Sequence, residues 1–225
     1  TVDVLVVPEM FWSKEMIKRC AIQWLMLGWL ILPSLAFAES AVDRLNTFVQ
    51  EVSQLEADFQ QTVIGTDGQV VEEATGQFLL SRPGKFRWDY ETPFPQQIVA
   101  DGERIWFYDV DLEQITVKLQ DEALAETPAG LLSGNTLPEA EYDIQELESE
   151  DDLQWVRLVP KADDNNYQTV ALAFDEKGIR EMLMVDSFDQ RTRLVFKNLK
   201  INPDLPASRF EFKAPSGVDV VGDVP

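Results

Sequence analysis

Most of the chain alternates apolar and polar positions with the period of a β-strand, in short runs separated by turn residues. These runs predict about ten or eleven strands at hairpin spacing: residues 56–64, 69–81, 85–90, 96–100, 104–109, 114–119, 142–147, 153–160, 168–175, 179–187 and 191–201. One more strand is predicted at 209–213. Within the second run, Gly76 predicts a bulge or bend. Successive hairpins favour antiparallel pairing, and a single sheet of this size is expected to curl.

Two segments depart from this pattern and predict helices. Residues 39–55 carry apolar side chains at helical spacing, which indicates an amphipathic helix with one buried face: Val42, Leu45, Phe48, Val49, Val52 and Leu55. Residues 121–132 contain Pro128 among alanines and leucines and predict short, broken helical pieces that end at Gly134. The chain is therefore expected to form one mainly β domain, in which a pair of helices covers the open face or mouth of the curled sheet.

The first 38 residues do not follow the domain's pattern. Residues 16–38 combine a basic start, an apolar run and the small-residue site Ala36-Phe37-Ala38, which is typical of a cleaved secretory signal. A membrane anchor is the alternative, although the run is short for a span. Residues 1–15 precede Met16 and are expected to be a non-native extension. The single domain then covers residues 39–225.

Composition narrows the possible functions of this domain. The chain's net charge of −21 falls entirely on residues 39–225, because residues 1–38 hold three acidic and three basic side chains. Such acidity argues against nucleic acid and anionic membrane surfaces as partners. The only cysteine is Cys20 and histidine is absent, which excludes Ser–His and Cys–His catalysis and leaves few ligands for transition metals. No cofactor or metal is expected. A secreted domain without cysteine fits a bacterial periplasm.

Residues 82–117 are the part of the chain richest in large rings. Alternation puts Phe86, Trp88 and Tyr90 on one face of a strand and their charged neighbours on the other face. The rings indicate the lining of a site for an apolar ligand, and plain core packing under the first helix is the alternative. We assign Trp106 and Tyr108 to the same lining, although alternation puts Ile105 and Phe107 on the opposite face from them.

Several segments, in the same order along the chain, resemble the periplasmic outer-membrane lipoprotein carrier (LolA) family of Gram-negative bacteria. The resemblance covers essentially all of residues 39–225. The strongest is Gly76-Gln-Phe-Leu-Leu-Ser-Arg-Pro-Gly-Lys-Phe-Arg-Trp88. The others are Phe59-Gln60-Gln61, Asp101-Gly102 through Trp106-Phe-Tyr-Asp109, Leu112-Glu-Gln114, Thr127-Pro-Ala-Gly-Leu-Leu-Ser-Gly134 and Phe210-Glu-Phe-Lys-Ala-Pro-Ser-Gly217. Each segment alone is weak, whereas their order is specific.

The resemblance implies an unclosed antiparallel β-barrel with an α-helical lid over a hydrophobic cavity. It implies a monomeric chaperone that accepts acylated lipoproteins from an inner-membrane ABC-type release complex and delivers them to an outer-membrane receptor. The chain's extreme acidity departs from the family and leaves the charge of its docking contacts open.

The same resemblance implies roles for particular residues. Arg82 is expected to point inward and latch the lid through backbone carbonyls, which its five N–H donors suit. An ordinary ion pair with Asp89 or Glu91 is the alternative. Leu131 and Leu132 would lie on the lid and contact cargo, or belong to a simple core helix. Phe86 is expected at the cavity rim, where a charged replacement should block transfer without unfolding the protein.

Other functions remain as alternatives. A module of the same fold could sense or bind lipid or lipoprotein without shuttling it. Asp109, Asp111 and Glu113 could be offered as hydrolase carboxylates or weak calcium ligands, but a solvated turn is the simpler interpretation in a chain with 40 acidic residues. A structural role fits the ring-rich segment poorly.

Overall fold

The computed structural model describes residues 40–124, 132–134, 139–148, 152–162 and 166–224. These residues belong to one compact unit, Glu39–Pro225. The predicted extension at 1–15, the predicted signal at 16–38 and the predicted lid residue Leu131 lie outside the described residues, and they stay predictions. Within the described residues, no helix is long and apolar enough to cross a membrane.

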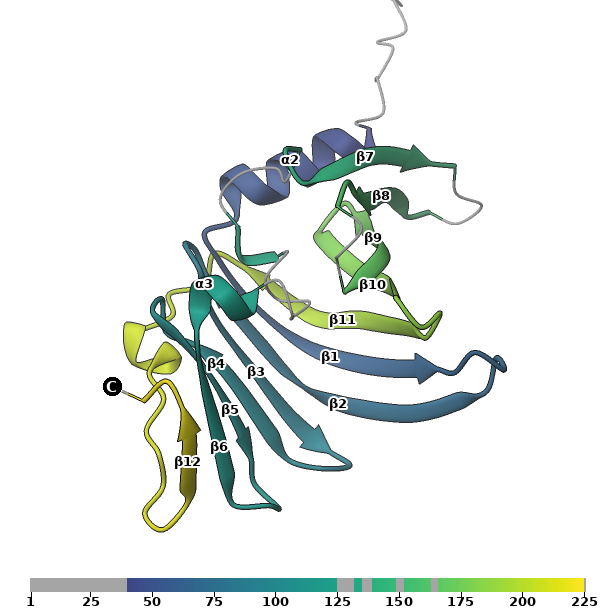
Figure 1. Cartoon of the computed structure of the whole chain (residues 1–225). Helices are drawn as coiled ribbons and strands as arrows, with labels where there is room; N and C mark the ends of the chain where they lie inside the picture. Colours follow the sequence, from purple (N-terminus) through teal and green to yellow (C-terminus); the bar gives the residue numbers. More distant parts are fainter. Residues whose placement is uncertain (1–39, 125–131, 135–138, 149–151, 163–165, 225) are drawn as a thin grey trace, which may run out of the picture. The chain divides into compact units, whose positions relative to one another are not determined.

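The unit is built on one unclosed, twelve-stranded sheet (Figure 1). The alternating pattern predicts eleven of its strands, and the family resemblance implies that the sheet does not close. In chain order its strands are β1 (Gln54–Ile64), β2 (Val70–Ser81), β3 (Lys85–Thr92), β4 (Gln96–Ala100), β5 (Arg104–Asp109), β6 (Gln114–Leu119), β7 (Tyr142–Leu147), β8 (Gln154–Pro160), β9 (Tyr167–Asp175), β10 (Gly178–Asp186), β11 (Arg191–Ile201) and β12 (Asp219–Gly222). Their order across the sheet is β12-β6-β5-β4-β3-β2-β1-β11-β10-β9-β8-β7. All pairs are antiparallel except β12 with β6. The sheet therefore has two free edges, β12 and β7.

The helix α2 (Ala41–Glu51) packs against β7 through β10 and is shorter than the sequence predicts. It begins with a capping box, in which the Ser40 hydroxyl accepts a hydrogen bond from the Asp43 amide at 3.1 Å. It ends at Glu51 because Asn202, the residue after β11, forms hydrogen bonds with the backbone there. The Asn202 side chain donates to the Glu51 carbonyl and accepts from the amides of Ser53 and Gln54, which turns the chain into β1.

The sheet buries apolar side chains on both faces. The face toward α2 carries the larger cluster, to which Leu45 and Phe48 of the helix contribute. On the opposite face, the C-terminal segment packs Leu205 and Phe210 against Leu79 of β2. The prediction of a strand at 209–213 is wrong. The C-terminal segment forms the 3₁₀ helix η2 (Ala207–Phe210) there, and its strand is β12, further along the chain. A second helical turn, α3 (Gln120–Ala123), follows β6.

Gly76 lies where the backbones of β2 and β3 come close together, and the irregularity predicted there has its extra residue, Glu91, in β3 and not in β2. The register of the two strands shifts between Thr75 and Gly76. A Cβ atom at Gly76 would lie 1.9 Å from the Asp89 carbonyl oxygen, which is closer than any contact that atoms tolerate. The backbone itself therefore occupies the space of a side chain at this position.

We expect Gly76→Ala to lower the free energy of unfolding by more than about 2 kcal/mol, because β2 and β3 must separate locally. Glu73→Ala, at an exposed position of the same strand, serves as the control and should change stability by less than about 0.5 kcal/mol. Urea unfolding of the two variants measures the difference. Equal stability of both variants would show that β2 and β3 are not held as closely as described.

Candidate functional site

The rings of β3 form a row on the sheet face that α2 covers. Phe86 is fully buried, Trp88 is 2 % exposed, and Tyr90 is half-buried at the outer end of the row. Phe59 of β1 and Phe78 of β2 flank the row, with ring centroids 5.2 and 4.7 Å from that of Trp88. We call these five side chains the ring row. Phe59 meets Trp88 and Tyr90 edge to face, Phe78 meets Trp88 at a tilt, and Trp88 stacks on Tyr90. These contacts hold the four rings in fixed relative orientations.

Trp106 and Tyr108 lie on the other face of the sheet, so the expectation that they line the same site as Trp88 is wrong. The pairing of β3 with β4 and of β4 with β5 brings Trp88, Ile98 and Phe107 into line on one face. Alternation then turns Trp106 and Tyr108 outward, where both contact Phe212 of the C-terminal segment at centroid distances of 5.2 and 5.9 Å. The sequence states this alternation but does not say which face is covered by the lid.

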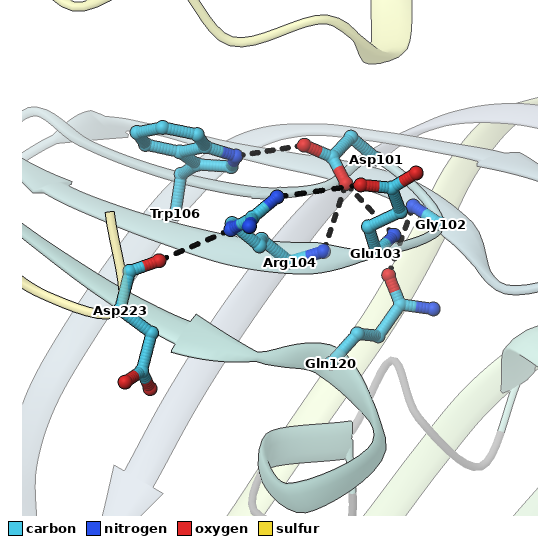
Figure 2. Close-up of polar contacts among 7 residues, drawn as sticks. All are labelled: Asp101, Gly102, Glu103, Arg104, Trp106, Gln120 and Asp223. Atoms are coloured by element: carbon cyan, nitrogen blue, oxygen red, sulfur yellow. Dashed lines mark hydrogen bonds and ion pairs between the residues drawn. The ribbon is translucent and has the colours of Figure 1, made fainter. Parts of the chain in front are cut away.

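A polar cluster at the turn between β4 and β5 fixes Trp106 in that outward position (Figure 2). The Trp106 Nε1–H donates to the Asp101 carboxylate at 2.9 Å, and the amides of Glu103 and Arg104 donate to its other oxygen. Arg104 Nε in turn donates to the carbonyl of Asp223, which ties down the end of the chain. Burial alone would raise the pKa of Asp101, but these hydrogen bonds and the charge of Arg104 outweigh it and hold that pKa below its usual value.

Gln120 connects this turn to the loop that carries Arg82. Its side-chain oxygen accepts from the Gly102 amide at 3.0 Å, as Figure 2 shows, and its Nε2 donates to the Gly84 carbonyl at 2.9 Å. Gln120 is 5 % exposed and opens α3. The sequence contains no signal for this role, because an isolated glutamine at a strand end is typical of a solvent-exposed position.

Arg82 directly follows β2, and its side chain contacts the end of α2 and residues 132–134. Its guanidinium donates to the carbonyls of Phe48 and Val52 at the end of α2, and to those of Leu132 and Gly134. The distances are 3.0 Å to Phe48, 2.7 Å to Leu132 and 2.8 Å to Gly134. The guanidinium carbon also lies 4.6 Å from the centre of the Phe48 ring. One side chain therefore bridges the C-terminal end of α2 and residues 132–134.

These contacts differ from the ion pair that was the alternative for Arg82. Asp89 lies on the outer face and pairs with Arg87 at 2.6 Å.

Burial lowers the pKa of Arg82 to about 10, so the side chain keeps its charge at neutral pH while losing part of its hydration. Carbonyl oxygens at the end of a helix carry partial negative charge, and they compensate for that loss. The role of these contacts in cargo release stays a prediction.

The remaining candidate residues are placed as follows. Leu132 is 1 % exposed and belongs to the same apolar cluster as the ring row. Asp109 accepts a hydrogen bond from the Leu112 amide at 2.9 Å and so closes the β5–β6 turn. Among the described residues, no group of three acidic side chains is placed to hold a metal ion. A pocket of about 280 Å³ borders Tyr90 and Gln61 at the outer end of the ring row.

An unclosed sheet with a helical cover held over a row of rings defines the class of lidded half-barrel proteins with an apolar interior. The comparisons with known proteins agree with this class. The sequence model of the family "Outer membrane lipoprotein carrier protein LolA" matches residues 50–213. The chain therefore belongs to the LolA family.

Individual relatives agree. An outer-membrane lipoprotein carrier protein from Nitrosomonas europaea is 43% identical over 185 residues, which are 82% of this chain and 90% of the relative. One from Chromobacterium violaceum is 44% identical over 182 residues, or 81% and 87% of the two chains. A crystal structure of an uncharacterised conserved protein from Thermus thermophilus shares the fold, with a TM-score of 0.51, 11% identity and coverage of 80% of this chain and 96% of that one.

The burial of Phe86 corrects its expected place at the rim and reverses the prediction for its replacement. Phe86 is 0 % exposed, so Phe86→Glu puts a carboxylate into the apolar cluster without a partner. We expect the variant to lose more than about 3 kcal/mol of unfolding free energy. Phe94→Glu is the control, because Phe94 is 71% exposed on the β3–β4 turn. Thermal unfolding of both variants tests this, and a Phe86→Glu variant as stable as the control would restore Phe86 to the rim.

Proposed function

We propose that the protein is a periplasmic chaperone that carries acylated lipoproteins. It takes them from an ATP-driven inner-membrane release complex and delivers them to an outer-membrane receptor. Membership of the LolA family and the names of the relatives, outer-membrane lipoprotein carrier proteins, support lipoprotein carriage. The secretory pattern of residues 16–38 and the cysteine-free domain support the periplasm as its location.

The observation that carries the mechanism is the bridge made by Arg82. It joins the end of α2 to residues 132–134, and Phe48 and Leu132 of these segments belong to the same apolar cluster as the ring row. The rings are buried in this state, so an acyl chain reaches them only if the cover moves. Moving the cover breaks the hydrogen bonds of Arg82, and cargo binding and closure therefore compete for the same space.

This competition suits a carrier, which must release what it binds. Burying an acyl chain contributes about 0.8 kcal/mol per CH₂, or on the order of 10 kcal/mol for a long chain. A hydrogen bond of a charged group contributes about 1.5–3 kcal/mol. Several such bonds, regained when the cover closes, offset a substantial part of the energy that holds the cargo. Closure thus lowers the net affinity and favours hand-over.

The end of α2 is placed to move. A pocket of about 210 Å³ lies against Phe48 and Val52 between this helix end and the β9–β10 turn. Displacement of the last helical turn toward that pocket meets less packed material than displacement into the sheet. Asn202 also donates to the Glu51 carbonyl, so this displacement would break that hydrogen bond. Its bonds from the amides of Ser53 and Gln54 would hold the chain that follows the helix.

We expect Arg82→Leu to take up lipoprotein but to release it poorly, because closure no longer regains the hydrogen bonds to the four carbonyls. The measurement is transfer of a radiolabelled lipoprotein from the purified carrier to the outer-membrane receptor. We expect the transferred fraction to fall at least about tenfold, the equivalent of one lost charged hydrogen bond.

Arg193→Leu is the matched control. Arg193 pairs with Glu181 on an exposed part of the sheet, away from the lid, so its transfer should equal that of the unchanged protein. Normal transfer by Arg82→Leu would contradict the release role of Arg82. Failure of the unchanged protein to take up lipoprotein at all would contradict the carrier function.

A further inference from the structure

Among the described residues, the buried indole N–H of Trp88 has no hydrogen-bond acceptor. The residue is 2 % exposed. An indole nitrogen can only donate, so nothing else can satisfy it. A buried polar group in this condition is rare in folded proteins and indicates a missing partner.

The neighbouring polar groups on aromatic side chains are satisfied. Trp106, on the outer face, donates its N–H to Asp101 at 2.9 Å (Figure 2). Tyr90, the next ring in the row, donates its hydroxyl to the Gln61 side chain at 3.1 Å. The fold thus supplies an acceptor for a tryptophan that only holds structure, and for the ring beside Trp88. The unsatisfied donor is the one in the middle of the ring row.

We propose that Trp88 Nε1–H donates a hydrogen bond to an acyl carbonyl of the bound lipid, the ester or amide oxygen at the head of a fatty chain. This inference rests on the proposed carrier function and adds a polar point of recognition to an otherwise apolar site. A pure hydrocarbon leaves the donor unsatisfied, whereas an acyl carbonyl satisfies it. The site then prefers acyl chains over other apolar molecules of equal size.

The surroundings of Trp88 select a neutral carbonyl over a charged group. Phe59 and Phe78 flank its indole, and Phe196 lies 6.1 Å from Phe78 between ring centres. A phosphate or carboxylate there would lose its hydration and gain a single donor in return. A carbonyl oxygen needs only one donor and brings no charge.

Access to Trp88 runs along the row from its outer end. The rings of Trp88 and Tyr90 are stacked with centres 6.3 Å apart, and Tyr90 borders the pocket of about 280 Å³. A chain that enters beside Tyr90 passes Trp88 after two residues of β3, or about 7 Å. The acyl carbonyl can therefore rest at Trp88 while the polar head stays near the pocket and the tail continues toward Phe86 under the lid.

The test compares two fluorescent probes of matched length: the methyl ester of pyrenyldecanoic acid and dodecylpyrene, which lacks the carbonyl. Titrations with the purified protein and with Trp88→Phe give four dissociation constants. Because the variant also loses apolar surface, the readout is the ratio of ester affinity to hydrocarbon affinity. We expect this ratio to fall about five- to tenfold in Trp88→Phe, as one lost hydrogen bond predicts. Trp106→Phe is the control, and its ratio should stay unchanged.

A second measurement does not depend on the variant folding. In the unchanged protein, the indole proton resonance of Trp88, assigned by triple-resonance NMR, should move downfield with the ester and not with the hydrocarbon. Competition by a diacylated lipopeptide and by phosphatidylglycerol tells which source of acyl carbonyl displaces the ester. An equal loss of affinity for both probes, or an unmoved resonance, would overturn the role of Trp88 and leave the carrier function standing. Binding of neither probe nor lipopeptide would overturn the carrier function itself.

Discussion

The set of hydrogen bonds from Arg82 to the helical carbonyls is the interaction on which the rest of the structure depends. A guanidinium can serve several acceptors at once, and these acceptors belong to two segments far apart in the chain, the end of α2 and residues 132–134. The bridge adds to other polar contacts of the cover: Arg44 donates to Gln154 and to the Asp175 carbonyl, and the Gly84 amide donates to the Ser133 carbonyl. Apolar packing does not distinguish a lid from an acyl chain, whereas the hydrogen bonds favour the lid. In the proposed carrier, these bonds would stabilise the closed state without making the ring row less attractive to lipid.

The remainder of the fold holds Arg82 in place. Gln120 ties the Gly84 carbonyl to the turn at Gly102, and Asp101 in that turn holds Trp106 and the amide of Arg104. The C-terminal segment covers the outer face through Phe210 and Phe212. One face of the sheet is thus fixed by packing and polar contacts, and the other carries the parts that the proposed function requires to move. An unclosed sheet permits this division, because its two faces are independent.

Much of this arrangement follows from local pattern. The strands at 96–100, 104–109, 114–119, 142–147 and 191–201 lie where alternation predicts them, because each has one face on a core. Alternation cannot say which face of the sheet meets the lid, so it does not predict that Trp106 and Tyr108 lie on the outer face. The end of α2 depends on Asn202, about 150 residues away in sequence, and β12 depends on pairing with β6. Such long-range contacts leave no local signal, and the position of Arg82 among the carbonyls came from family resemblance.

The most direct test of the account is a distance between the cover and the sheet, with and without cargo. Cysteines replacing the exposed residues Gln50 of α2 and Glu103 of the β4–β5 turn, in a chain whose sole native cysteine Cys20 is replaced, accept spin labels for a pulsed electron-spin measurement. The account predicts that a triacylated lipopeptide lengthens the distance between the labels, and that removing the peptide restores it. A single unchanged distance with the peptide fully bound would show that cargo and the Arg82 bridge do not compete.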